Sequence, residues 1–227
     1  MPAGFISNGN FCDTKIAFVM FELSKIYDPA FFKTWGKSNR AYVDSAFRIA
    51  RVLYDYFQPK SLIDWGCGAG AHSFFFRRQG VRVLSIDAVP PPEDEKFPIE
   101  IVEHDLTEPI TTDLGKFDLA VCFDVAEHIP VEHQNIFLSN ITRFSDRLLL
   151  SCAPPWQGGH HHVNEQPKRY WIQSLESHGF HYLRRKTGEL IETFKAMQSA
   201  MPLEYAWMFR HISVYERFNK CGANYVP

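Results

Sequence analysis

A glycine-rich turn that follows a short apolar run is the feature that most constrains how this chain can fold. Residues 61–65 predict a buried strand, residues 66–70 contain three glycines, and residues 71–79 predict a helix that stops at Gly80. Glycine lets the backbone turn sharply and lets a ligand approach it closely. The pattern predicts an α/β domain with a ligand at this turn, because such sheets bind ligands where their parallel strands end.

Alternating strands and helices continue on both sides of the turn. Asp44 is the predicted N-terminal acid of a first helix, and the basic residues 184–186 are interpreted as an exposed strand end. Alternation of this kind indicates a mostly parallel sheet covered on both faces. We predict further strands at residues 81–86, 99–103, 119–123, 147–152, 180–185 and 207–217, and further helices at 44–57, 132–144, 167–178 and 189–200.

Composition limits the location and the partners of the protein. A net charge of −2 argues against broad electrostatic binding to nucleic acid. The five cysteines form no C-x-x-C pair, and Cys67, Cys122 and Cys152 lie in segments predicted to be buried, which indicates reduced thiols. The first ten residues do not look like a secretory leader, and no stretch approaches the roughly 20 apolar residues of a membrane span. We therefore expect a soluble cytoplasmic protein without a nucleic-acid or membrane partner.

Acidic residues on either side of the glycine turn narrow down its ligand. Gly66, Gly68 and Ala71 match the dinucleotide pattern G-x-G-x-x-A, so the glycines alone also fit a nicotinamide cofactor. Asp87 ends the next strand, 87 − 68 = 19 residues after Gly68, where a carboxylate can accept the ribose hydroxyls of either cofactor. Asp64 would oppose a pyrophosphate, whereas it favours the ammonium and sulfonium groups of S-adenosylmethionine. The structural alternative for these acids is to cap a helix or a loop.

Four motifs together resemble those of class I S-adenosylmethionine-dependent methyltransferases, over about residues 27–217. LIDWGCGAG at 62–70 resembles the first motif of that family, SID at 85–87 the second, and EHDL at 103–106 and FDLAVCFDVAEHI at 117–129 the third and fourth. The resemblance implies a three-layer Rossmann-like sandwich with a seven-stranded, mostly parallel sheet of order 3-2-1-4-5-7-6 and an antiparallel last strand. It implies a single domain over 1–227, with a helical N-terminal cover (1–58), a cofactor-binding half (59–153) and an acceptor-side half (154–227).

The resemblance also implies S-adenosyl-L-methionine as the cofactor and a small-molecule methyl acceptor. Asp105, after the third strand, is placed for the adenine amino group, and Asp124 for the methionine part of the cofactor. The residues expected to bind the cofactor are Asp64, Gly66, Cys67, Gly68, Asp87, Ala88, Asp105, Leu106, Phe123, Asp124, Val125 and His128.

Catalytic candidates lie in the loops after the fourth and fifth strands. Methylation of a hydroxyl requires a base, and histidine as a residue type is suited to this near neutral pH. His162 is the predicted base, because His-Val-Asn at 162–164 followed by Pro167 resembles a subset that acts on sugars and other small metabolites. His128 and Asp124 are the further candidates.

The three adjacent histidines of 160–162 also raise the hypothesis of a metal site. Neighbouring side chains of an extended segment point to alternate sides, so at most two of them could share one ion. We therefore assign no metal ligand, and a polar loop that caps the next helix is the remaining interpretation. The N-terminal aromatic segment resembles a cover over cofactor and acceptor, in which Tyr27, Trp35, Arg40 and Tyr42 could touch either ligand.

Three other functions remain open at the level of sequence. An N-methyltransferase of a small molecule is the first, although no N-P-P-Y-type tetrapeptide follows the fourth strand, where the sequence reads DVAE at 124–127. The second is an NAD-dependent oxidoreductase, which Asp64 and the lack of a Tyr-x-x-x-Lys pair after the fifth strand oppose. The third is a scaffold that binds the cofactor without turnover, since a fold alone does not establish chemistry.

Overall fold

The computed structural model describes residues 22–197, 201–202, 205 and 208–218. Cys12 and Cys221 and residues 1–21 of the predicted cover therefore lie outside the described residues. Cys67, Cys122 and Cys152 are free thiols in buried positions, as expected. No helix within the described ranges is long and apolar enough to cross a membrane.

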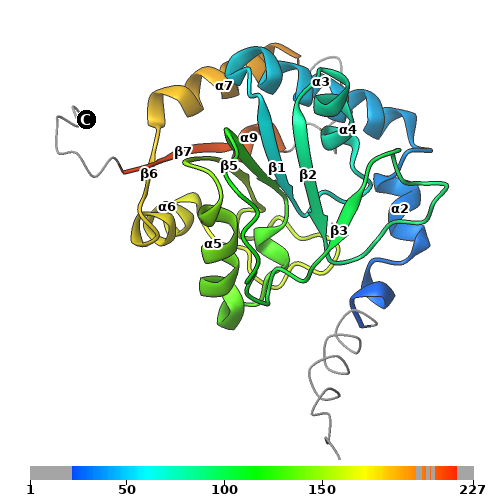
Figure 1. The fold of residues 1–227 in the computed structure, drawn as a ribbon, viewed down its shortest axis with the longest axis horizontal. Helices are drawn as coiled ribbons and strands as arrows, with labels where there is room; N and C mark the ends of the chain where they lie inside the picture. Colours follow the sequence, from blue (N-terminus) through cyan, green and yellow to red (C-terminus); the bar gives the residue numbers. More distant parts are fainter. Residues whose placement is uncertain (1–21, 198–200, 203–204, 206–207, 219–227) are drawn as a thin grey trace, which may run out of the picture.

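One seven-stranded sheet forms the centre of the structure (Figure 1). Its order is β3-β2-β1-β4-β5-β7-β6, and neighbouring strands are parallel except where β7 pairs with β5 and β6. The order and the antiparallel last strand confirm the predicted Rossmann-like sheet. The strands are β1 (Ser61–Trp65), β2 (Arg82–Asp87), β3 (Ile101–Glu103), β4 (Leu119–Phe123), β5 (Arg147–Ser151), β6 (Phe180–Tyr182) and β7 (Ser213–Arg217).

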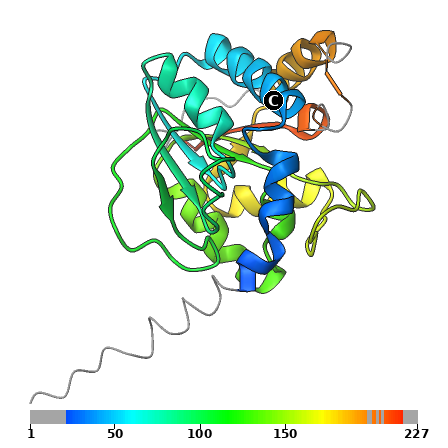
Figure 2. The ribbon, with the colours of Figure 1, turned by 90° about the vertical axis from the view of Figure 1, so that its right-hand side faces the viewer.

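Helices cover the sheet in two layers (Figures 1 and 2). One layer contains α3 (Arg40–Phe57), α4 (Ala71–Arg78) and α7 (Arg184–Met197), and the other contains α5 (Gln134–Arg143) and α6 (Lys168–Ser177). The described part of the chain also contains the short helices α2 (Pro29–Trp35) and α9 (Met208–His211), two 3-10 helices, Ala126–His128 and Val131–His133, and helical residues at 22–26.

The alternation of side chains along β1 explains how the two layers are built. Leu62 packs with the α3, α4 and α7 layer, whereas Ile63 and Trp65 pack with the α5 and α6 layer. Successive residues of a strand point to opposite faces, so Asp64 lies on the same face as Leu62. All five residues of β1 are buried, which is typical of a central parallel strand.

The largest differences between predicted and observed boundaries lie at the start of α3, at the junction of β6 and α7, and at the start of β7. Asn39 caps α3, because its side-chain oxygen accepts hydrogen bonds from the backbone N–H groups of Ala41 and Tyr42 (3.1 and 3.3 Å). The helix therefore begins at Arg40, and the prediction of Asp44 as its N-terminal acid is wrong.

The basic residues 184–186 begin α7 rather than ending a strand. β6 ends at Tyr182, and Lys186 forms an ion pair with Glu216 of β7 (2.9 Å). The last strand begins at Ser213, where its pairing with Leu150 of β5 starts, and α9 precedes it in place of the predicted strand residues. Trp207, the predicted start of that strand, lies outside the described residues.

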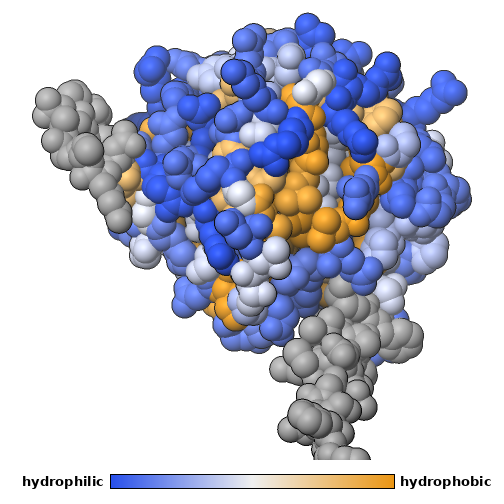
Figure 3. Space-filling view, in the orientation of Figure 1, coloured by the Kyte–Doolittle hydropathy of each residue, from blue (hydrophilic) through white to orange (hydrophobic). Residues whose placement is uncertain are grey.

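The connection between β3 and β4 has no helix, and the α5 and α6 layer therefore leaves part of β2 and β3 uncovered. Residues 104–118 form turns and irregular backbone. Val102 of β3 is 41% exposed, and Figure 3 shows hydrophobic residues gathered near the centre of this face of the molecule. Buried Asn140 of α5 holds the connection: its amide donates to the carbonyls of Leu106 (3.1 Å) and Glu108 (2.9 Å) and its oxygen accepts from the Ile110 N–H (3.0 Å).

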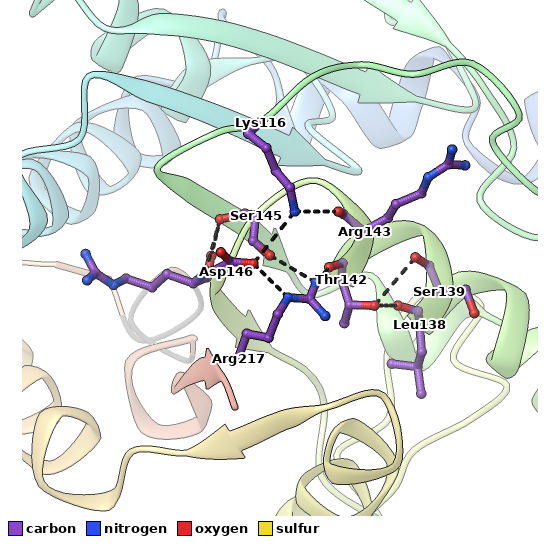
Figure 4. A network of polar contacts seen from close by, with 9 residues as sticks. Lys116, Leu138, Ser139, Thr142, Arg143, Ser145, Asp146 and Arg217 are labelled. Atoms are coloured by element: carbon purple, nitrogen blue, oxygen red, sulfur yellow. Dashed lines mark hydrogen bonds and ion pairs between the residues drawn. The ribbon is translucent and has the colours of Figure 1, made fainter. Parts of the chain in front are cut away.

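A polar network lies at the edge of the sheet where β5 begins and β7 ends (Figure 4). Arg217, the last residue of β7, donates to the Asp146 carboxylate (2.7 Å) and to the backbone carbonyl of Thr142. Lys116 donates to the Arg143 carbonyl (3.2 Å) and lies 3.7 Å from Asp146. The network ties the ends of β7 and α5 to the start of β5, at the edge where the first four strands begin.

We predict that Asn140→Ala lowers the free energy of unfolding by about 2 kcal/mol, because it leaves the buried Leu106 carbonyl and the buried Ile110 N–H without their partner. Urea unfolding would measure the loss. Asn135→Ala, on the exposed side of the same helix, serves as the control and should change stability little. Equal stability of the two variants would show that the connection does not depend on Asn140.

Candidate functional site

A cavity of about 430 Å³ lies where β1, β2 and β4 end. This volume is in the range of small-ligand sites. Nine of the twelve predicted cofactor residues line it: Gly66, Gly68, Asp87, Ala88, Asp105, Leu106, Asp124, Val125 and His128. Sequence reasoning did not assign its other lining residues, which are Leu23, Phe31, Phe32, Thr107, Glu108, Ile129, Pro130, His133 and His161, whereas Tyr27 was expected from the cover.

The glycine turn shapes one wall of the cavity. Gly66 and Gly68 have φ angles of 69° and 54°, which L-residues rarely adopt. A Cβ atom on Gly66 would overlap the Val125 side chain, whereas one on Gly68 would meet no atom within 4 Å. Gly66 therefore allows close packing against the loop after β4, and Gly68 leaves open space on the cavity side.

Asp87 presents a carboxylate at the end of β2. Its Oδ2 accepts from the Gly68 N–H (2.7 Å) and its Oδ1 from the Val89 N–H (3.0 Å). Burial raises the pKa of this carboxyl, and the backbone hydrogen bonds oppose that shift. Each oxygen keeps a further lone pair, so the carboxylate can accept two hydroxyls of a ribose.

Asp105 and Leu106 form the adjoining wall. The Asp105 carboxylate accepts from the backbone N–H and the hydroxyl of Thr107 (2.9 and 2.8 Å), which fixes the turn after β3. Asn140 holds the Leu106 carbonyl from behind. The capping alternative for Asp105 is thus present in the structure together with its place on the cavity wall.

Asp64, Cys67 and Phe123 are not on the cavity wall. Asp64 is 2% exposed and accepts a hydrogen bond from the Ser73 hydroxyl of α4 (2.7 Å), because it points to the α3, α4 and α7 face. Cys67 is buried within the turn, and Phe123 packs against the His72 ring (5.4 Å between centroids). Cofactor binding by these three residues stays a prediction.

The N-terminal segment covers the cavity. The Tyr27 ring contacts Phe31 of α2 and His128 (5.1 and 5.8 Å between centroids), and α2 crosses the front of the molecule in Figure 2. Burial raises the pKa of Tyr27, with smaller contributions from Asp87 and Glu127, so its hydroxyl stays neutral.

Other predicted cover residues lie elsewhere. Trp35 and Tyr42 line a second, smaller cavity of about 30 Å³ that also includes Asp124 and Tyr205. Arg40 starts α3 and lines neither of these two cavities.

Glu95 fastens the cover to the loop after β2. Its 1% exposed carboxylate accepts from Lys33 of α2 (2.5 Å) and from the backbone and hydroxyl of Ser38 (2.9 and 2.7 Å). Burial raises the pKa of Glu95, but the hydrogen bonds from Lys33 and Ser38 outweigh it and lower the pKa to about 2.

Glu127 joins the loops after β4 and β5. Its backbone carbonyl accepts from the N–H groups of Val163 and Asn164 (both 2.9 Å), and its Oε1 accepts from the Ala153 N–H (3.0 Å). These bonds hold the loop after β5 beside His128. The centroids of the His128 and His162 rings lie 4.9 Å apart. A distance in sequence of 35 residues, 162 − 127, is thereby closed.

The predicted catalytic residues lie together at this junction. Asp124 accepts from the Ser151 hydroxyl (2.7 Å), and the His162 Nδ1 lies 2.8 Å from Glu165 Oε1. Burial raises the pKa of Asp124 and, together with the charge of Asp124, raises that of Glu127 well above its usual value. Burial lowers the pKa of His128 to about 4, so its ring is neutral near pH 7.

The three adjacent histidines, 160–162, point to three different places. His160 Nε2 bonds to the Ile26 carbonyl (2.6 Å), His161 lines the cavity, and His162 pairs with Glu165 beside the cavity wall. The run therefore does not gather around one point. Glu165 was not predicted, although its position three residues after His162 is a signal that the sequence contains.

The fold, the glycine turn and the strand-end acids define a class I methyltransferase. The model of the methyltransferase domain family matches residues 44–217, and the chain belongs to this family. The predicted enzyme class and S-adenosylmethionine as its methyl donor are confirmed at the level of the family. This family assignment excludes the alternative of an NAD-dependent oxidoreductase.

One curated relative is the magnesium-protoporphyrin O-methyltransferase of Synechocystis sp., which is 30% identical over 125 residues. The match covers 51% of this chain and about half (54%) of that relative. A solved structure, the 1,6-didemethyltoxoflavin-N1-methyltransferase of Burkholderia thailandensis, has a TM-score of 0.60 and 17% identity over 96% of this chain and 95% of its own. The mitomycin 7-O-methyltransferase MmcR has a TM-score of 0.54 and 16% identity, over 73% of this chain and 56% of its own.

We predict that Asp64 makes the stability of the cofactor-free protein depend on pH. Burial raises its pKa to about 7, although the Ser73 hydrogen bond lowers it, while an unfolded aspartate ionises near pH 3.9. The folded state binds the proton more tightly, so this stability is complete below about pH 4 and is lost as pH rises through about 7. Asp64→Asn removes the dependence, and it should be more stable than the parent protein at pH 8 by on the order of 4 kcal/mol.

Urea unfolding from pH 4 to pH 8 would test this. Asn keeps an oxygen for the Ser73 hydroxyl, and Asp44→Asn on the exposed side of α3 is the control. Parallel pH profiles of the parent protein and Asp64→Asn would contradict the prediction.

Proposed function

We propose that this enzyme methylates a hydroxyl group of a small organic molecule, such as a sugar or another metabolite, with His162 as the base. The observation that carries the proposal is the His162–Glu165 pair, which lies beside the cavity wall formed by His128. A hydroxyl acceptor must lose its proton in the transfer, and a histidine oriented by a carboxylate is a frequent means of removing one.

The cofactor half of the cavity fits S-adenosylmethionine. Asp87 offers two carboxylate oxygens to a ribose, and the open space at Gly68 admits a close approach to the backbone. Asp105 and Leu106 would flank the adenine, and Asp124 and Val125 the methionine part. When bound, the cofactor supplies a methyl group carried by a positively charged sulfur. Asp64 lies behind the turn, so its attraction for the ammonium would act through the turn rather than by contact.

The acceptor side supplies the base and its support. With the proton on Nδ1, the His162 ring donates to Glu165 and leaves Nε2 free to take the proton of a hydroxyl. Burial raises the pKa of Glu165, but hydrogen bonds from His162 and from the Gly158 and Trp156 N–H groups lower it by more. The net pKa is below its usual value, so this carboxyl stays ionised. Its charge stabilises the ring once it has accepted a proton.

Gly159 gives the His162 ring its place. A Cβ atom at Gly159 would overlap this ring, so the glycine allows the loop to pass directly beside it. Side chains of the cover, including Tyr27 and Phe31, close the cavity beside His128 and would exclude water from the transfer.

The relatives support an organic acceptor. The names of the Synechocystis relative and of MmcR each describe an O-methyltransferase of an organic compound. The aromatic and apolar lining of this cavity suits an acceptor of that kind. An amine is the second candidate, since the Burkholderia structure that aligns over nearly the whole chain is an N1-methyltransferase.

We predict that calorimetric titration detects low-micromolar binding of S-adenosylmethionine and S-adenosylhomocysteine, and that Asp87→Ala weakens it at least tenfold. The variant removes the acceptor of the ribose hydroxyls. Asp113→Ala, an exposed acid on the connection between β3 and β4, is the matched control and should bind as the parent does. Binding of NAD in place of the methyl donor would overturn the proposed function.

We predict that His162→Ala lowers kcat for a hydroxyl acceptor by about 100-fold or more, because the acceptor keeps its proton. Formation of S-adenosylhomocysteine would be followed with a panel of phenols, hexoses and primary amines. Binding of S-adenosylhomocysteine should change less than twofold, and His178→Gln, at the end of α6, should keep full activity. If amines alone are methylated, and equally well by His162→Ala, the acceptor is nitrogen and His162 is not the base.

A further inference from the structure

Three side chains at the junction of the loops after β4 and β5 have the arrangement of a metal site. Glu127, His128 and His162 each offer one ligand atom, and these atoms lie within 4.8 Å of one another. Glu127 and His128 come from the 3-10 helix Ala126–His128, and His162 comes from the loop after β5. The backbone bonds of Glu127 to that loop fix the two segments relative to each other.

Each of the three side chains is held through one polar atom and keeps the other available. His128 Nδ1 bonds to the His161 carbonyl (3.2 Å) and His162 Nδ1 to Glu165 (2.8 Å), which leaves Nε2 free on both rings. Histidines that bind metals almost always donate their second ring N–H to a carbonyl or a carboxylate in this way.

Glu127 completes the same pattern with oxygen. Its Oε1 accepts from the Ala153 N–H, whereas its Oε2 is buried and has no hydrogen-bond partner among the described residues. The residue is 1% exposed. A buried carboxylate oxygen without a partner is unfavourable, so this atom points to a ligand that binds it.

The charges around the cluster also favour a cation. Asp124 lies on the cavity wall and acts electrostatically on both Glu127 and His162. Among the described residues, no lysine or arginine lines this cavity. A divalent ion between these groups would offset the repulsion of two neighbouring carboxylates.

We propose that Glu127, His128 and His162 bind one divalent transition-metal ion of the zinc type at the acceptor end of the cavity. Two imidazoles and one carboxylate are a ligand set for zinc and related ions, and three protein ligands leave a further position open. Bonds of about 2.1 Å require ligand atoms roughly 3.4 Å apart, so the side chains draw together when the ion binds. The cluster adjoins the cavity through His128.

The role of this ion rests on one part of the proposed function, the hydroxyl acceptor, and it replaces His162 as the base whenever the ion is bound. The ion and a proton compete for Nε2 of His162, so His162 is a ligand while the ion is bound. An acceptor hydroxyl at the open position then loses its proton more readily. The proton passes to the Asp124 carboxylate, the oxygen bonds to the methyl carbon, and the carbon–sulfur bond breaks with its electron pair left on sulfur.

Direct binding tests the site without any assay of turnover. Protein freed of metal by a chelator would be titrated with Co²⁺, read by its visible absorption, and with Zn²⁺ by calorimetry. We expect one ion per chain and at least tenfold weaker binding in Glu127→Gln and in His162→Ala. Glutamine keeps the oxygen that accepts from Ala153, and binding of S-adenosylhomocysteine reports that each variant is folded.

His160→Gln is the matched control, because His160 belongs to the same run but bonds to Ile26 instead of joining the cluster. It should bind Co²⁺ as the parent does. Loss of binding in His160→Gln with retention in Glu127→Gln would overturn the site and assign the ion to the histidine run. Failure to bind one ion per chain would also overturn it.

Activity separates this inference from the proposed function. If chelated protein methylates a hydroxyl with unchanged kcat, the role of the ion is overturned and His162 as base stands. If one ion binds at the cluster but no hydroxyl is methylated, the metal site stands and the proposed function is overturned.

Discussion

The acceptor side of this enzyme depends on the hydrogen bonds of one residue, Glu127. Its backbone carbonyl holds the loop at Val163 and Asn164, and its side chain holds the same loop at Ala153. Together with the bond from the Asn164 amide to the Ile129 carbonyl (3.0 Å), these bonds fix the loop relative to the end of β4 and bring His162 beside His128. Because the carboxylate is buried, these bonds form in an environment where they are strong and where an unpaired oxygen is unfavourable.

The sequence predicted the cofactor half well because its structure is local. The strand, glycine turn and helix from residue 61 to residue 78 lie next to one another in sequence, and β1 and β4 have the predicted bounds. The wall at Asp87 follows from the parallel pairing of β1 and β2, which the alternation of elements already indicates. Asp64 was predicted to bind the cofactor; the strand alternation points it to the face with Ser73, and its role in binding stays a prediction. The direction of the Asp64 side chain follows from the alternation of side chains along β1, and the glycine motif alone does not indicate it.

The acceptor half could be predicted only in part, because its contacts join residues that are far apart in the sequence. The motif gave His162 and His128 as candidates, but the bond from Ala153 to Glu127 and the pair of His162 with Glu165 follow from the folded loop. The absence of a helix between β3 and β4 was consistent with the sequence, yet the anchoring of that segment by Asn140 needed the position of α5. The start of α3 was misjudged because Asn39 competes for the same capping role as Asp44.

The hydrogen bonds of Glu95 have a consequence for the way the cover and the cofactor wall depend on each other. Glu95 lies on the loop that follows Asp87 and Ala88, and it binds Lys33 of α2 and Ser38 just after α2. One buried carboxylate therefore joins the loop after β2 to the segment that carries Tyr27 and Phe31. The wall that faces the cofactor and the wall that faces the acceptor are thus parts of one hydrogen-bonded unit, although about 60 residues separate them in the sequence.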